Sequence, residues 1–139
     1  MADIRNMENF IASKWSYRHF DEVFSPTRIS FGDLDGVVER NGKFLVIETK
    51  GEGIPVPRGQ AIMFDRLVEK GDFTVVVLWG NPPCEVKQWC LWPLQIEDAN
   101  KDIVRSFIDE WWREANQNMS GRCVVVDAGI PVTPDPNRA

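Results

Sequence analysis

The sequence predicts an α/β protein in which a mixed central β-sheet is flanked by helices. Three observations favour this class: Asn41-Gly42 joins two β-rich runs, a continuous apolar run ends at Trp79, and segments with helical spacing lie around them. Such alternation indicates helices packed in layers against a sheet. Because 139 residues is the size of one domain, we expect residues 1–128 to form a single domain. The proline-rich residues 129–139 are expected to be a flexible tail.

The composition narrows the class of protein. A hydrophobic share of 43% and a charged share of 27% are typical of globular proteins and exclude a disordered or collagen-like chain. The sequence has neither an apolar run of the ~20 residues that a membrane span needs nor the features of a signal peptide, so we expect a cytoplasmic protein without membrane contact. Three unclustered cysteines cannot alone hold an iron–sulfur cluster. The net charge of −5 argues mildly against nucleic acid, which would need a local basic surface.

The N-terminal part of the chain predicts a helix followed by a hairpin. Apolar residues at helical spacing indicate an amphipathic helix from Ala2 to about Trp15, with Glu8 on its apolar stripe. The segments Ile29 to Arg40 and Lys43 to Lys50 are β-rich. Asn-Gly between them is the strongest short-range hairpin signal, so we expect a two-residue turn.

The middle of the chain predicts a helix and then a buried strand. Pro57 is well placed to open a helix that runs to about Lys70, with Gly71 as its stop. The run from Phe73 to Trp79 is continuously apolar, which is typical of a strand covered on both faces. We therefore expect this strand to be central.

The C-terminal part predicts short strands around a long helix. Val86 to Leu94 indicates one or two strands, and an amphipathic pattern from Ile103 to Ala115 indicates the helix. Asp98 or Asn100 is the expected helix cap. Cys123 to Val126 is expected to add a strand.

Charged residues gather on one face of the predicted hairpin. With a two-residue turn, Asp35 faces Glu48 and Asp33 faces Lys50, and alternation places all four side chains on the same face. Two opposed acids repel each other unless a positive charge lies between them, which a divalent metal and a lysine would supply. The alternative is a solvated surface cluster that contributes little.

These residues resemble the PD-(D/E)XK nuclease superfamily, in particular its RecB-like or resolvase-like branch. The resemblance rests on G-D-L-D-G at Gly32 to Gly36, E-T-K at Glu48 to Lys50, and the Q-x-x-x-F pattern at Gln60 to Phe64. Leu34 stands where the motif name has proline, directly before Asp35. The resemblance implies a restriction-endonuclease-like core and a DNA nuclease dependent on Mg²⁺, with Mn²⁺ able to substitute. It also implies a role in DNA replication, recombination or repair.

The resemblance also implies a role for each residue of the motif. Asp35, Glu48 and the backbone carbonyl of Thr49 would hold the metal, whose preferred ligands are oxygens. Lys50 would orient the attacking water and stabilise developing charge. Gln60, near a helix N-terminus, would meet phosphate; a solvated glutamine is the alternative.

Several alternatives stay open at this stage. Glu8 is a candidate further metal ligand, with a salt bridge to an arginine as the competing account. Within the nucleases acting on DNA, the alternatives are an exonuclease-like or replication-repair nuclease and a Holliday-junction resolvase or restriction-type endonuclease. A resolvase would be a homodimer with two sites. A catalytically inactive DNA- or protein-binding module with a nuclease fold is a second class, and a structural subunit using the Trp-rich C-terminal half is a third.

Overall fold

The structure, a computed structural model, describes residues 8–9, 14–117, 129, 131 and 133. The chain divides into two compact units, Met1–Asp33 and Leu34–Ala139, which are described separately below. The expectation of a single domain over residues 1–128 stays a prediction. In the part of the chain that is described, no helix is both long and apolar enough to cross a membrane.

Some predicted elements fall wholly or largely outside the described residues. These are the strand Cys123 to Val126, the tail at residues 129–139, and most of the N-terminal helix, of which only Glu8 and Asn9 are described as helical. Trp15 is not helical, so the predicted end of that helix is too late.

Besides the helical residues Glu8 and Asn9, the described part of the first unit contains two short helical segments. They are the α-helix α2 (Arg18–Asp21) and the 3₁₀-helix η1 (Glu22–Phe24). The ring of Phe31 packs against those of Tyr17 and Phe24, with centroids 5.5 Å and 5.6 Å apart. Neither helix has a buried residue, so the described part of this unit has an exposed, aromatic-rich surface.

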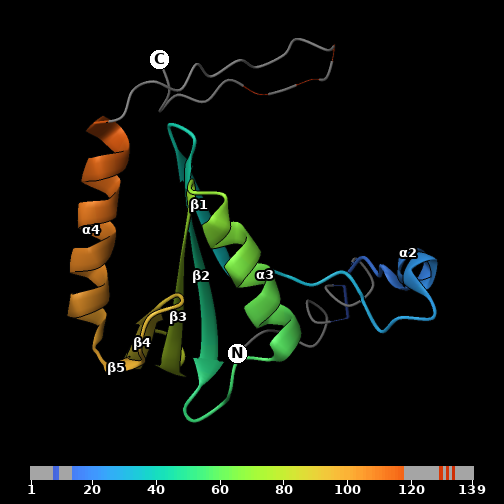
Figure 1. The fold of residues 1–139 in the computed structure, drawn as a ribbon, viewed down its shortest axis with the longest axis horizontal. Helices are drawn as coiled ribbons and strands as arrows, with labels where there is room; N and C mark the ends of the chain where they lie inside the picture. Colours follow the sequence, from blue (N-terminus) through green and yellow to red (C-terminus); the bar gives the residue numbers. More distant parts are fainter. Residues whose placement is uncertain (1–7, 10–13, 118–128, 130, 132, 134–139) are drawn as a thin grey trace. The chain divides into compact units, whose positions relative to one another are not determined.

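The second unit is built on a five-stranded mixed sheet, as the sequence predicts (Figure 1). Its strands, in spatial as well as chain order, are β1 (Gly36–Arg40), β2 (Lys43–Gly51), β3 (Phe73–Asn81), β4 (Glu85–Leu91) and β5 (Glu97–Asp98). Only β2 and β3 are parallel; the other neighbours are antiparallel. The expectation that the run ending at Trp79 is central is confirmed, whereas β5 was not predicted.

The β1–β2 hairpin has the predicted register. Arg40 pairs with Lys43, and Asn41 and Gly42 have φ of 51° and 82°, the left-handed conformations that a two-residue turn requires. However, β1 begins at Gly36 rather than near Ile29. The preceding segment is rich in glycine and aspartate, which are poor strand formers, and it makes no ladder.

The two helices of this unit cover opposite faces of the sheet (Figure 1). The helix α3 (Arg58–Glu69) connects the parallel strands β2 and β3, and α4 (Lys101–Gln117) follows β5. The predicted signals at their ends are confirmed: Gly71 follows α3 at φ 83°, and the Asn100 side chain accepts hydrogen bonds from the first turn of α4. The other expected cap, Asp98, lies in β5.

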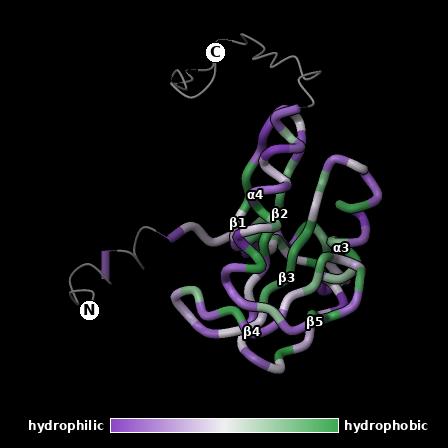
Figure 2. The backbone as a smooth tube through the Cα atoms, turned by 90° about the vertical axis from the view of Figure 1, so that its left-hand side faces the viewer, coloured by the Kyte–Doolittle hydropathy of each residue, from purple (hydrophilic) through white to green (hydrophobic). Residues whose placement is uncertain are grey.

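The core lies on both faces of β2 and β3, where hydrophobic residues are concentrated (Figure 2). The α3 face holds a buried cluster of Val46, Phe64, Val75, Val77, Trp79 and Cys90. The α4 face holds Leu45, Val76, Trp111 and Ala115. Alternation along β2 therefore fixes which helix each residue after Val46 faces.

The hairpin turn also contacts the last turns of α4. The Asn41 side-chain amide donates to the carbonyl of Ala115 at 3.0 Å, and Arg40 donates to Asn116 at 2.7 Å. The Arg40 guanidinium lies over the ring of Trp112, 5.2 Å from its centroid. These contacts join residues more than 70 positions apart in the chain.

Candidate functional site

The predicted site residues on β2 come at the carboxyl end of that strand. Val46 lies in the core on the α3 face, so alternation places Glu48 and Lys50 on the α3 face and Thr49 on the α4 face. The parallel pairing of β2 with β3 sets Lys50 beside Trp79. The hairpin register and the crossover through α3 thus bring these side chains to the first turn of α3.

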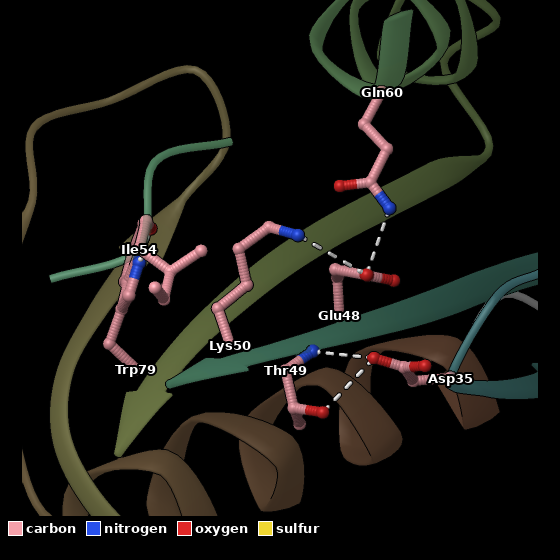
Figure 3. Close-up of polar contacts among 7 residues, drawn as sticks. All are labelled: Asp35, Glu48, Thr49, Lys50, Ile54, Gln60 and Trp79. Carbon is pink, nitrogen blue, oxygen red and sulfur yellow. Dashed lines mark hydrogen bonds and ion pairs between the residues drawn. The ribbon is translucent and has the colours of Figure 1, made fainter. Parts of the chain in front are cut away.

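Three of the predicted residues form one cluster, which we call the Glu48 cluster: Glu48, Lys50 and Gln60 (Figure 3). The Gln60 amide donates to Oε1 of Glu48 at 2.9 Å, and the Lys50 ammonium lies 3.6 Å from the same oxygen. The side chains of Glu48 and Lys50 are only 7% and 10% exposed. The prediction that Gln60 faces the sheet from the start of α3 is confirmed.

Burial makes this cluster unlike an ordinary surface ion pair. A buried carboxylate loses its hydration, and one ammonium at 3.6 Å with one amide compensates only part of that loss. Two buried oxygens, Oε2 of Glu48 and Oε1 of Gln60, accept no hydrogen bond from the residues that the structure describes. The alternative of a solvated charge cluster is therefore wrong for Glu48 and Lys50.

Asp35 takes a different position from the one expected. Its Oδ2 accepts hydrogen bonds from the backbone amide and the hydroxyl of Thr49, at 2.8 Å and 3.0 Å. Thr49 points to the α4 side of β2, so Asp35 lies on the opposite side of the strand from Glu48 (Figure 3). The physical reason is that the pairing of β1 with β2 ends at Gly36. The Asp35 side chain is therefore not held by the ladder, and it accepts the hydrogen bond from the Thr49 amide that a residue of β1 would otherwise accept.

The remaining predicted acids belong to the first unit. Glu8 and Asp33 are both exposed there. The metal-ligand roles of Glu8, of the Asp35 and Glu48 pair, and of the Thr49 carbonyl stay predictions.

Whether the Glu48 cluster fits a metal ion depends on which of its oxygen atoms are available as ligands. Among the described residues, no group of three or more His, Cys, Asp or Glu side chains is placed to hold a metal. Mg²⁺, however, keeps several waters and is held by one or two carboxylates. Oε2 of Glu48, which accepts no hydrogen bond from the described residues, is a carboxylate oxygen of the kind that Mg²⁺ or Mn²⁺ takes as a ligand, so Glu48 could serve as one ligand of such an ion.

The sequence reasoning missed a set of residues beside Lys50. A cavity of about 350 Å³ is lined by residues 49–51 and 78–86. The indole nitrogen of Trp79 donates to the carbonyl of Ile54 at 2.7 Å and so holds the loop after β2 against β3. A buried tryptophan needs a hydrogen-bond acceptor for its indole N–H. This requirement was the one signal in the sequence that could have indicated a contact between Trp79 and the loop after β2.

Comparisons with protein-family models, with curated proteins and with solved structures give no match for this chain. The resemblance to the PD-(D/E)XK superfamily therefore stays a prediction, and the fold and the Glu48 cluster define the class only as an α/β protein with a buried acid–lysine–amide site.

Proposed function

We propose that this protein is a metal-dependent nuclease that hydrolyses phosphodiester bonds of DNA, with a restriction-endonuclease-like core and a cytoplasmic location. The single observation that carries the proposal is the burial of Glu48 between Lys50 and Gln60, where two oxygens accept no hydrogen bond from any described residue. Charged groups held in a costly buried arrangement at a strand end are typical of functional sites. The sequence motif that contains them supports phosphodiester hydrolysis over other reactions.

Each residue of the Glu48 cluster would have its own role in phosphodiester hydrolysis. Glu48 would hold a divalent cation through the oxygen that has no donor, and the cation would supply positive charge to the phosphate and lower the pKa of a bound water. Gln60 positions Glu48 by its hydrogen bond. Lys50 would hold the attacking water or stabilise charge on the phosphate oxygens. Asp35 would join the site only after leaving Thr49.

One observation favours the second class, an inactive DNA- or protein-binding module. In the structure, both hydrogen bonds of Asp35 go to Thr49, on the side of β2 away from Glu48. A scaffold of this kind would have no need to gather two carboxylates. Metal binding separates the two classes, because an inactive module has no reason to bind Mn²⁺ or Mg²⁺.

The test combines a metal titration with cleavage assays on duplex, single-stranded, flap and four-way-junction DNA. We expect Mn²⁺ to bind by calorimetry and to support cleavage. Glu48→Gln should weaken both, because it removes the charge of the only buried acid among the described residues. The matched control is Glu69→Gln, which changes an exposed acid at the other end of α3 and should alter neither.

A folded protein that neither binds Mn²⁺ nor cleaves any of these substrates would contradict the proposal. Cleavage restricted to the junction by a dimer would identify a resolvase. Cleavage of linear duplex would instead favour a restriction-type or exonuclease-like enzyme.

A further inference from the structure

The cavity beside Lys50 has no role in the hydrolysis proposed above. It lies where β2 and β3 end and where the turn into β4 begins, all within the second unit. Its volume of about 350 Å³ falls in the range of pockets that hold small ligands. Because Lys50 is one of its lining residues, the cavity adjoins the Glu48 cluster.

The walls of the cavity suit a largely apolar group. Five of the lining residues are apolar or aromatic: Leu78, Trp79, Pro82, Pro83 and Val86. Gly80 keeps the turn close, because a Cβ at this position would lie 1.8 Å from the carbonyl oxygen of Glu85. A nucleobase has the shape and the apolar faces that such walls accept.

The wall of the cavity contains an ionised carboxylate that can accept hydrogen bonds from a ligand. Glu85 lines it, and Asn81 donates hydrogen bonds to Glu85 at 3.4 Å and to Glu52 at 2.9 Å. A hydrogen bond from Lys87, then the charge of Lys87 and a hydrogen bond from Asn81, lower the pKa of Glu85, so this acid is ionised at neutral pH. Carboxylates accept hydrogen bonds from the amino groups of bases, so Glu85 could pair with a base inside the cavity.

We propose that this cavity receives one unpaired nucleobase of the strand whose phosphate lies at Lys50. The inference rests on the proposed nuclease function and names its substrate class. A base inside a duplex is stacked and paired and cannot enter such a pocket unless it leaves the stack. The preferred substrates are therefore strands with unpaired nucleotides, as in single strands, flaps and mismatches, and fully paired duplex is a poor substrate.

The exposed thiol of Cys84 reports directly on occupancy, because Cys84 lines the cavity. We would measure the rate of its alkylation by N-ethylmaleimide, with Ca²⁺ present to limit cleavage, in a Cys123→Ser background. Cys90 is an internal control: burial raises the pKa of its thiol, so it should stay unmodified while the protein is folded. Mapping by mass spectrometry separates the two thiols.

The probes are a single-stranded DNA of about 15 nucleotides and the matching duplex, each at about ten times its own Kd as measured by fluorescence anisotropy. The single strand should slow alkylation of Cys84 about tenfold, since about one site in eleven stays free, and the duplex should not. Equal protection by both, or no protection by a bound single strand, overturns the inference.

A second variant tests the same idea through activity. Cys84→Phe adds a ring to the lining of the cavity and should raise KM for the single strand several-fold more than KM for the duplex; Cys84→Ser is the matched control of similar size. If Mn²⁺-dependent cleavage occurs without these effects, the cavity proposal fails and the nuclease proposal stands. If no DNA is bound or cleaved, both fail.

Discussion

Replacing Lys50 should change both the stability of the protein and its activity, and the two effects can be measured separately. Its ammonium is the only cation that an ion pair places beside Glu48 in the described residues, and both side chains are buried. Lys50→Met should therefore lower the free energy of unfolding by roughly 3 kcal/mol, because it leaves a buried carboxylate without its counter-ion. Urea denaturation measures this loss. In the double variant Glu48→Gln, Lys50→Met, the loss should be smaller, and an additive result would contradict the pairing.

Lys50 should also matter for activity when stability is accounted for. In single-turnover assays at a temperature where Lys50→Met is folded, cleavage should fall by about 10²- to 10⁴-fold. Metal affinity should change little, since Lys50 is not a proposed ligand. Full activity in this variant would rule out the proposed mechanism.

The site residues were predictable from sequence to different degrees. Glu48, Lys50 and Gln60 follow from periodicity alone: alternation along a regular strand and the spacing of a helix fix the faces of their side chains. Asp35 was not predictable in the same way because it lies one residue outside the ladder, where no period constrains a side chain. Its hydrogen bonds to Thr49 depend on where β1 begins.

At the scale of elements, the close approach between β3 and β4 at Gly80 sets the shape of the turn. The register shifts between Trp79 and Gly80, and the space for a Cβ there is filled by the backbone of Glu85. Gly80→Ala should destabilise the protein by about 1–3 kcal/mol, because a backbone clash must be relieved. Thermal denaturation measures the change. Gly51→Ala is the control, since its nearest contact is an ordinary 3.5 Å to Ile54, and an equal loss there would contradict the argument.

The elements that the sequence predicts well are those with strong local signals. Asn41-Gly42 favours a two-residue turn, the apolar run of β3 is continuous, and the helical period of α4 extends over several turns. The two residues of β5 and the four of α2 carry no such period. Their structure depends on tertiary contacts, which a single sequence does not display.

At the scale of the whole molecule, DNA binding has to overcome a net charge of −5. Affinity must then come from a few local cations, and it should fall steeply as salt rises, because each phosphate contact releases counterions. Arg58, exposed at the start of α3 near Gln60, is the cation that we expect to contribute. Arg58→Ala should weaken binding and reduce the slope of log K against log salt by about 1.

Fluorescence anisotropy over a range of salt concentrations measures that slope. Arg66→Ala, which removes an exposed arginine further along α3, is the control and should leave the slope unchanged. Binding that is insensitive to salt would exclude phosphate contacts as its source.

The contacts between the hairpin turn and α4 should determine which parts of the second unit unfold together locally. The last turns of a helix normally fray, because their carbonyls lack partners. Here the carbonyl of Ala115 has a partner in Asn41, and Arg40 holds Trp112 and Asn116. The amide protons near Ala115 should therefore exchange with solvent as slowly as those of β2, and Asn41→Ala should speed the exchange at both places together. The turn and the end of α4 would then open as one cooperative unit, although more than 70 residues separate them in the chain.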